Sequence, residues 1–148
     1  HVLDLFCGLG NFSLPMAQQA KSVVGIEWSE AMVDQARRNA KANQLENTEF
    51  YACDLQASNL LLNPPQWLHA YDKCLIDPPR SGAKEVIETI IETIRPKEIA
   101  YISCHSASFV RDSVLLQARG YRLKYVTVAD MFVHTAHVEV VAYFTQSN

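Results

Sequence analysis

The feature that most constrains the fold of this chain is a regular alternation of two sequence patterns. Short apolar runs rich in β-branched residues are separated by amphipathic stretches, an order typical of strands joined by crossover helices. The strand-like runs cover residues 2–5, 22–26, 48–52, 74–76, 99–103, 122–129 and 138–144. We therefore expect an α/β fold, a three-layer sandwich in which helices flank a mostly parallel seven-stranded sheet.

Helix signals mark the ends of two of the amphipathic stretches. The first helix is expected over residues 29–42, with Ser29 capping its start. A second is expected to start at Ser106 or Ser108 and to end just before Gly120, which suits the left-handed residue that commonly ends a helix. Because no helix signal follows Gly120, the last two strand-like runs should form an antiparallel pair, so that the last strand is antiparallel.

Residues 56–71 are the least regular part of the chain. They contain Asn63, Pro64 and Pro65, and we expect a short helix followed by an irregular connection.

Length and composition indicate one domain, residues 1–148. Of these residues 49% are hydrophobic, enough for a full core, and no apolar run approaches the roughly 18 residues of a membrane span. A strand-like run begins at residue 2 with no leader before it, so we expect a C-terminal fragment of a longer protein. The net charge of −3 opposes a domain that holds nucleic acid by charge alone.

The cysteines at positions 7, 53, 74 and 104 are scattered and form no C-x-x-C pair. This pattern indicates neither a zinc ribbon nor a disulfide framework, and it favours a reducing, cytoplasmic location. His134-x-x-His137 has a spacing seen in metal sites, but no convincing third ligand accompanies it. We expect no metal in this fragment.

The run VLDLFCGLGNFS predicts a strand, a tight Gly-x-Gly turn and a helix. Gly8 and Gly10 allow the backbone to approach a ligand, and the helix start offers free N–H groups. Glu27 closes the second strand, where a carboxylate can bind both hydroxyls of a ribose, and Asp54 closes the third, near the expected adenine. Ser13 replaces the third glycine of the NAD fingerprint. The alternative is a structural glycine turn with surface acids.

The carboxyl ends of the fourth and fifth strands carry candidate reactive groups. Asp77-Pro-Pro-Arg80-Ser-Gly82 follows the fourth strand, and its prolines fix the backbone that presents Asp77, although such a turn can also be purely structural. Arg80 stands where amino-methylating enzymes have a base-stacking aromatic residue. Cys104 precedes a helix, whose N-terminus favours the thiolate, whereas the other cysteines are expected to be small buried hydrophobes.

The run DMFVHTAHVE supplies candidates for a general base: Glu139, His134 and His137. Glu139 interrupts an apolar run that should be buried, and a carboxylate in such surroundings usually has a task or a partner. The alternative is a solvated strand residue.

Taken together, DLFCGLGNF, DPPRSG, the strand-end Ser-Cys and DMFVHTAHVE resemble the RNA uracil-5-methyltransferase family, most closely its bacterial 23S rRNA members. The resemblance runs nearly end to end. It implies a class I, Rossmann-like methyltransferase fold, S-adenosylmethionine (AdoMet) as cofactor, and RNA, most closely ribosomal RNA, as partner. No membrane and no obligate protein partner are implied.

The resemblance also implies roles for individual residues. Cys104 looks like the nucleophile that adds to C6 of the base, Glu139 like the base that takes the C5 proton, and Asp77 like the group that hydrogen-bonds the uracil. Arg80, Phe12 and Phe132 are candidate walls for an extruded base. The expected cofactor-binding residues are Asp4, Phe6, Gly8, Gly10, Phe12, Glu27, Asp54 and Asp77.

Two departures from the family pattern stand out. The family usually writes Ser-Cys-Asn-Pro at the nucleophile, whereas this chain has Ser103-Cys104-His105-Ser106. The family's amino-terminal RNA-binding part, which in many members carries an iron-sulfur cluster, is outside this sequence. Alternatives are a tRNA uracil-5 enzyme, an RNA cytosine-5 enzyme, which would carry a cysteine where Arg80 stands, and a non-catalytic module that binds AdoMet or a partner protein.

Overall fold

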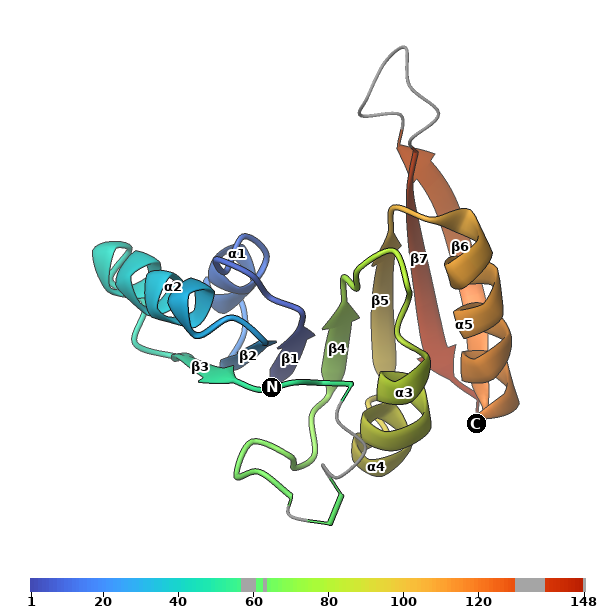
Figure 1. Ribbon diagram of the computed structural model, residues 1–148, viewed down its shortest axis with the longest axis horizontal. Helices are drawn as coiled ribbons and strands as arrows, with labels where there is room; N and C mark the ends of the chain where they lie inside the picture. The colour runs from blue at the N-terminus through green and yellow to red at the C-terminus, as the bar shows by residue number, and fades with distance from the viewer. Residues whose placement is uncertain (57–60, 63, 130–137, 148) are drawn as a thin grey trace.

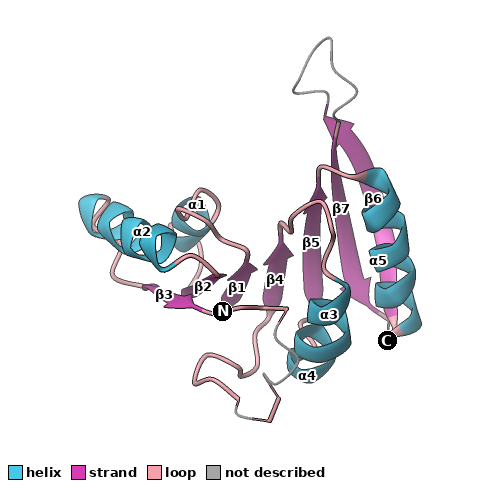
Figure 2. Cartoon of the chain, viewed as in Figure 1, coloured by secondary structure: helices cyan, strands magenta, loops and turns pink. Residues whose placement is uncertain are grey.

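The computed structural model describes residues 1–56, 61–62, 64–129 and 138–147. Figure 1 and Figure 2 show a single twisted sheet flanked by helices. The elements in chain order are β1 (Val2–Leu5), α1 (Ser13–Ala17), β2 (Val23–Glu27), α2 (Glu30–Ala42), β3 (Thr48–Ala52), β4 (Lys73–Ile76), α3 (Lys84–Val86), the π-helical segment η1 (Ile87–Ile91), α4 (Glu92–Ile94), β5 (Glu98–Ser103), α5 (Ser106–Ala118), β6 (Tyr121–Ala129) and β7 (Glu139–Gln146).

The sheet contains seven strands in the order β3-β2-β1-β4-β5-β7-β6. The pairings from β3 through β5 are parallel, whereas β7 is antiparallel to both of its neighbours, β5 and β6. This confirms the expected mostly parallel sheet with an antiparallel last strand. The strand order reverses between β1 and β4, and doubly wound sheets bind ligands at the carboxyl edge of such a point.

Alternate residues of the strands pack against different helices. Leu3 and Leu5 of β1 join the core formed with α3, η1, α4 and α5, whereas Val2 packs against Ala17 at the end of α1. Because successive strand residues point to opposite faces, these helix groups cover opposite faces of the sheet. Figure 1 shows α1 and α2 beside β1, β2 and β3, and α5 beside β6. The three-layer arrangement is therefore confirmed.

One local expectation, the cap of α5, is corrected. The N-cap of α5 is His105, whose side chain accepts the Ser108 backbone N–H, instead of Ser106 or Ser108. An imidazole nitrogen satisfies the same orphan donor that a serine hydroxyl would.

The short helix expected at the start of residues 56–71 falls mainly on residues 57–60, which lie outside the described residues, whereas residues 64–71 form the irregular connection that we expected. Consecutive prolines lack the N–H groups that a helix needs. The side chain of Trp67 is buried in the core, and the Tyr71 hydroxyl donates to the Trp67 carbonyl oxygen at 2.7 Å. Aromatic anchoring therefore fixes the end of this connection.

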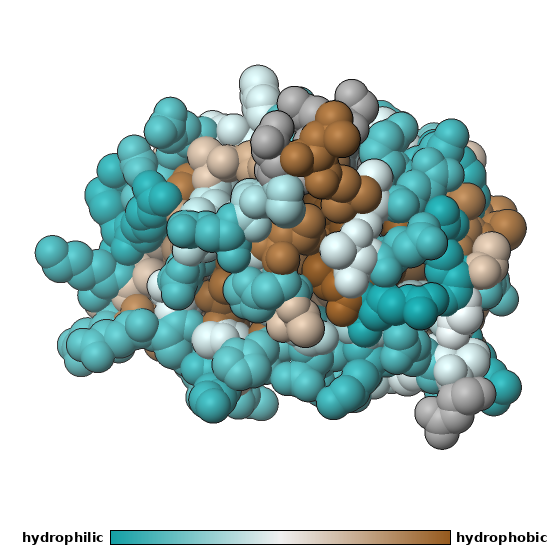
Figure 3. All heavy atoms as spheres, turned by 90° about the horizontal axis from the view of Figure 1, so that it is seen from below, coloured by the Kyte–Doolittle hydropathy of each residue, from teal (hydrophilic) through white to brown (hydrophobic). Residues whose placement is uncertain are grey.

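No helix in the described part of the chain is long and apolar enough to cross a membrane. Figure 3 shows a mainly hydrophilic surface on which apolar side chains gather near the middle of the face seen from below. The exposed large apolar residues include Trp28, directly after β2, and Met32 in the first turn of α2.

Gly25, in the middle of β2, offers a test of the packing between the sheet and α2. A Cβ at this position would lie 2.6 Å from Phe50 Cδ1 and 2.8 Å from Cys7 Sγ. We predict that Gly25→Ala lowers the free energy of unfolding by about 1–3 kcal/mol, measured by urea denaturation. Phe50→Leu in the same chain should recover part of the loss, and strictly additive effects of the two changes would contradict this contact.

Candidate active site

The glycine turn between β1 and α1 bends the backbone sharply at the carboxyl end of β1. Phe6, Gly8 and Gly10 have φ angles of 66°, 54° and 86°, a region that residues other than glycine rarely adopt. A Cβ at Gly8 would meet no atom within 4 Å, so backbone conformation, and not space, favours glycine there. The Cys7 N–H donates to the Ile26 carbonyl oxygen at 3.0 Å, which ties the turn to β2.

Glu27, the last residue of β2, joins two loops through its carboxylate. Its Oε2 accepts the Gly8 backbone N–H at 3.2 Å, and its Oε1 accepts the Ser29 backbone N–H at 3.1 Å. Two carboxylate oxygens offer about four acceptor positions, so Glu27 retains capacity for the two hydroxyls of a ribose. The loop contacts hold the carboxylate in place for such a ligand.

Asp4 lies fully buried beneath the glycine turn. Its Oδ2 accepts the Ser13 hydroxyl at 2.5 Å, while its Oδ1 has no hydrogen-bond partner among the described residues. Burial raises the pKa of Asp4 from 3.8 to about 7, against the opposing effect of the Ser13 hydrogen bond. The buried hydrogen bond between Ser13 and Asp4 therefore links the start of α1 to β1 on either side of the glycine turn.

A cavity of about 610 Å³ opens at the carboxyl ends of β1, β2, β3 and β4. Four residues expected to bind a cofactor meet here: Phe6, Glu27, Asp54 and Asp77. The other lining residues are Trp28, Met32, Cys53, Leu55, Gln56, Pro78 and Pro79. Acidic groups and apolar surfaces thus face one space, a combination suited to a nucleoside.

The remaining expected cofactor residues lie beside this cavity. Gly8, Gly10 and Phe12 form the turn that borders it, and Asp4 lies under that turn, without being part of the lining. Phe12 is exposed immediately before α1.

Trp28 and Met32 line the cavity although the sequence analysis did not single them out. Trp28 directly follows the strand-end Glu27, and Met32 lies in the first turn of α2. The exposed fraction of Trp28 is 75%, unusual for so large an apolar side chain. A tryptophan next to a strand-end acid is the signal that could have identified it.

Cys53 also departs from the expectation of a buried hydrophobe, because it is half-buried and lines the cavity. Cys7 and Cys74 are buried, as expected.

The strand register brings the candidate nucleophile and base to one place. Ser103 at the end of β5 pairs with Val140 of the antiparallel β7. Cys104 follows Ser103 and Glu139 precedes Val140, so each lies one residue beyond this pair, at the edge of the sheet where the parallel strands end.

Asp77 follows β4 at the same edge of the sheet, and its neighbourhood changes its acidity. Burial raises the pKa of Asp77 from 3.8 to about 6, and the negative charge of Glu139 adds to the rise. The two carboxylates are therefore close enough to interact. A carboxyl group with this pKa can donate as well as accept a hydrogen bond near neutral pH.

The loop that carries Cys104 is held by local hydrogen bonds. The Ser103 hydroxyl donates to the His105 carbonyl oxygen at 3.0 Å and accepts the His105 N–H at 3.1 Å. His105 Nδ1 accepts the Ser108 N–H at 3.3 Å. These contacts constrain a loop that lacks the proline usual in the family motif, and they leave Cys104 half-buried just before α5.

Of the other expected substrate residues, the structure describes Arg80 but not Phe132. Arg80 is exposed in the turn after Pro79 and does not line the cavity. Phe132, His134 and His137 lie outside the described residues, so their roles remain predictions. Among the described residues, no group of three or more His, Cys, Asp or Glu side chains could hold a metal ion.

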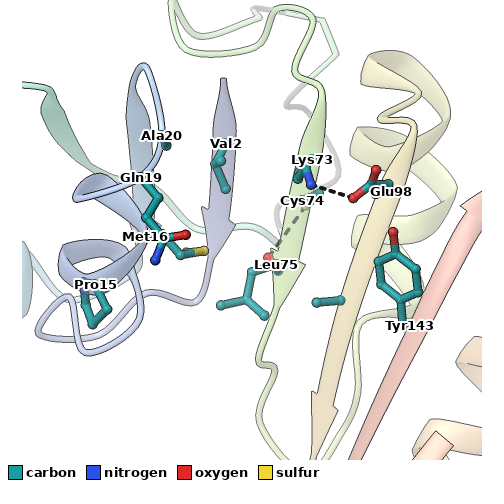
Figure 4. A pocket seen from close by; sticks show the side chains of 11 residues that line it. Val2, Pro15, Met16, Gln19, Ala20, Lys73, Cys74, Leu75, Glu98 and Tyr143 are labelled. Atoms are coloured by element: carbon teal, nitrogen blue, oxygen red, sulfur yellow. Dashed lines mark hydrogen bonds and ion pairs between the residues drawn. The ribbon is translucent and has the colours of Figure 1, made fainter. Parts of the chain in front are cut away.

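A second cavity of about 520 Å³ lies over β1, β4, β5 and β7, next to α1. Figure 4 shows Lys73 and Glu98 paired at its edge, with 2.7 Å between Lys73 Nζ and Glu98 Oε2. Apolar side chains such as Val2 and Met16 form much of the remaining lining. None of the expected site residues that the structure describes lines this cavity.

The strand order, the glycine turn and the acidic strand ends define a nucleotide-binding α/β domain of the methyltransferase type. The chain belongs to the methyltransferase-domain family, whose model matches residues 1–122.

Curated relatives match nearly the whole chain. It is 46% identical over 147 residues to the 23S rRNA (uracil(1939)-C(5))-methyltransferase RlmD of Shewanella halifaxensis, with 99% of this chain and 32% of the relative covered. It is 48% identical over 151 residues to the RlmD of Hahella chejuensis, with 99% and 33% covered. The chain thus spans about a third of the length of these relatives.

Solved structures share the fold. The tRNA (uracil-54, C5)-methyltransferase of Pyrococcus abyssi, in complex with S-adenosyl-L-homocysteine, superposes with a TM-score of 0.82 at 30% identity, covering 97% of this chain and 34% of that one. The magnesium protoporphyrin IX methyltransferase of Synechocystis, with bound AdoMet, has a TM-score of 0.74 at 19% identity, covering 99% and 69%. The fold is therefore that of class I AdoMet-dependent methyltransferases, as expected.

The buried Asp4 predicts how stability depends on pH. Its pKa is raised on folding, so its stabilising contribution is complete below about pH 4 and is lost as the pH rises through about 7. In the wild-type protein the free energy of unfolding, measured by urea denaturation, should therefore fall with rising pH by up to about 1.4 kcal/mol per pH unit. We expect Asp4→Asn to remove this fall. Asp34→Asn, at an exposed position of α2, is the matched control, and identical slopes in wild type and Asp4→Asn would contradict the assignment.

Proposed function

We propose that this chain is the catalytic domain of a longer cytoplasmic enzyme that transfers a methyl group from AdoMet to C5 of a uridine in RNA, through a covalent adduct with Cys104. The observation that carries the proposal is the strand register, which brings the end of β5 and the start of β7, and with them Cys104 and Glu139, to the edge of the sheet where Asp77 follows β4. The 23S rRNA uracil-C5 enzymes that match nearly the whole chain support it.

The cavity at the strand ends fits AdoMet. Glu27 would bind the ribose hydroxyls, and Asp54, after β3, would face the adenine edge. Trp28, Met32 and Leu55 supply apolar surface for the flat base. When bound there, AdoMet supplies an electrophilic methyl group.

Cys104 would supply the nucleophile that activates C5 of the uracil. C5 of uracil is a poor nucleophile until a thiolate adds to C6, because the addition shifts the C5=C6 electron pair towards the O4 carbonyl as an enolate. Cys104 is half-buried and lies two residues before the start of the 13-residue α5. Asp77 would hydrogen-bond the ring and hold it over the nucleophile.

Glu139 would complete the reaction. C5 gains the methyl group when the enolate collapses, and it then carries both a methyl group and a proton. Glu139 removes that proton, the electron pair re-forms the C5=C6 bond, and the Cys104 thiolate leaves C6. Glu139 is half-buried at the start of β7, and its negative charge contributes to the raised pKa of Asp77. Both facts are consistent with a carboxylate that acts on substrate.

Ribosomal RNA is the favoured substrate class, because relatives at 46% and 48% identity are named for 23S rRNA, whereas the tRNA enzyme of known structure is 30% identical. The target base would have to lie in a loop or be extruded to reach this edge. The net charge of −3 implies that the rest of the enzyme grips the RNA. Mapping 5-methyluridine in RNA from cells with and without the gene distinguishes rRNA from tRNA.

The cofactor assignment predicts a clear binding result. Glu27→Ala in the full-length enzyme should weaken AdoMet binding by about 10- to 100-fold in calorimetry, because a charge-assisted hydrogen bond is worth about 1.5–3 kcal/mol. Glu46→Ala, an exposed position before β3, is the control and should bind normally. Equal losses from the two changes would refute the role of Glu27.

Removing the nucleophile and removing the base should have opposite signatures. Cys104→Ala should abolish methylation and leave AdoMet binding intact. Glu139→Gln should still form the adduct and accept the methyl group, but should stall while joined to RNA because the C5 proton has no efficient acceptor. A slow band in denaturing electrophoresis, labelled from methyl-labelled AdoMet, detects this species.

The double variant that also lacks Cys104 should show no such band. A structural Glu139 predicts lower stability or activity without a labelled band. Accumulation of the adduct on replacing His134 or His137, and not Glu139, would assign the base to a histidine.

A further inference from the structure

A buried carboxylate on α5 binds several elements at once. The Asp112 side chain has an exposed fraction of 0%. Its Oδ2 accepts the Ala83 backbone N–H at 2.6 Å and the Tyr101 hydroxyl at 2.5 Å. Its Oδ1 accepts from Arg111 Nε at 2.8 Å. Burial of a charged group is costly unless it is paired and hydrogen-bonded, and Asp112 meets both conditions.

These contacts dock the turn after β4 against α5. The guanidinium of Arg111 also donates from Nη2 to the Ser81 carbonyl oxygen at 2.8 Å. Gly82, with a φ of 84°, packs so closely that a Cβ there would lie 2.5 Å from Asp112 Oδ2. The turn that begins with Asp77 is therefore pinned at its far end, through Ser81, Gly82 and Ala83.

The same carboxylate is linked to both sides of the nucleophile loop. Tyr101 lies in β5 before Cys104, and α5, which carries Asp112, begins after it. The ring of Tyr101 packs edge to face on Phe109 of α5, with 5.8 Å between the ring centroids. The Asp77 turn and the Cys104 loop thus share one rigid anchor.

We infer that Asp112 is a positioning residue, which fixes the Asp77 turn relative to Cys104 through Tyr101, Arg111 and the Ala83 amide. The inference rests on the proposed function, because it assigns the anchor a role in holding uracil over the thiolate. Asp112 does not line the cofactor cavity, so its removal should misplace the reacting groups and leave cofactor binding alone.

Asp112→Asn in the full-length enzyme tests this role. The single-turnover rate of methyl transfer to RNA should fall on the order of 10- to 100-fold, since small misplacements of reacting groups have effects of this size. The Kd for AdoMet, measured by calorimetry, should be unchanged. Tyr101→Phe removes one hydrogen-bond donor to Asp112 and keeps the ring, so it should show a smaller loss of the same rate. This second variant keeps the inference testable if Asp112→Asn fails to fold.

Hydrogen exchange supplies a readout that is independent of substrate. The amides of Gly82 and Ala83 should exchange faster in Asp112→Asn, whereas Asp34→Asn, an exposed position of α2, should leave exchange and rate unchanged. A folded Asp112→Asn enzyme with wild-type rate and exchange, or one that loses AdoMet binding in parallel with rate, would overturn the inference. Faster exchange in an enzyme whose wild type makes no 5-methyluridine would instead refute the proposed function.

Discussion

The antiparallel pairing of β7 with β5 is the constraint on which the candidate active site depends. Because β7 returns between β5 and β6, its first residue, Glu139, comes to the edge of the sheet where the parallel strands end. Side chains alternate between faces along a strand, so a slip of one residue in this register would turn Glu139 to the other face. The apolar residues Val140, Ala142 and Phe144, all buried, fix the register and with it the position of Glu139, the proposed base.

Burial of carboxyl groups is the energetic cost of this arrangement. The pKa values of Asp4 and Asp77 are raised to about 7 and about 6, because both lie in or beside the core at the end of a strand. Such groups destabilise the folded chain near neutral pH, and they cluster at functional sites. Asp112, by contrast, is buried and accepts hydrogen bonds from the Ala83 amide, Tyr101 and Arg111. These bonds hold the turn after β4 against α5 and β5.

The sequence predicted the strands and α2 well, because β-branched runs and the Ser29 cap are local signals. Four residues of the cavity, Phe6, Glu27, Asp54 and Asp77, could also be found, since each follows or ends a strand. The positive φ of Phe6 and the cavity position of Met32 depend on tertiary contacts and left no local pattern. Trp28 did leave one, its place next to the strand-end Glu27. The His105 cap is a local contact with Ser108, but serine is the more usual capping residue. The short helix expected within residues 56–71 lies mainly outside the described residues.

The most direct test of the account is the fate of RNA that carries 5-fluorouridine at the target position. 5-Fluorouridine carries fluorine in place of the C5 hydrogen that Glu139 would remove as a proton. Elimination should therefore fail after methyl transfer, and the Cys104–C6 bond should persist. Mass spectrometry should then find enzyme, RNA and one methyl group joined, with the modified nucleotide on the Cys104 peptide after digestion. Methylated RNA released without an adduct, or an adduct on Cys7, Cys53 or Cys74, would contradict the account.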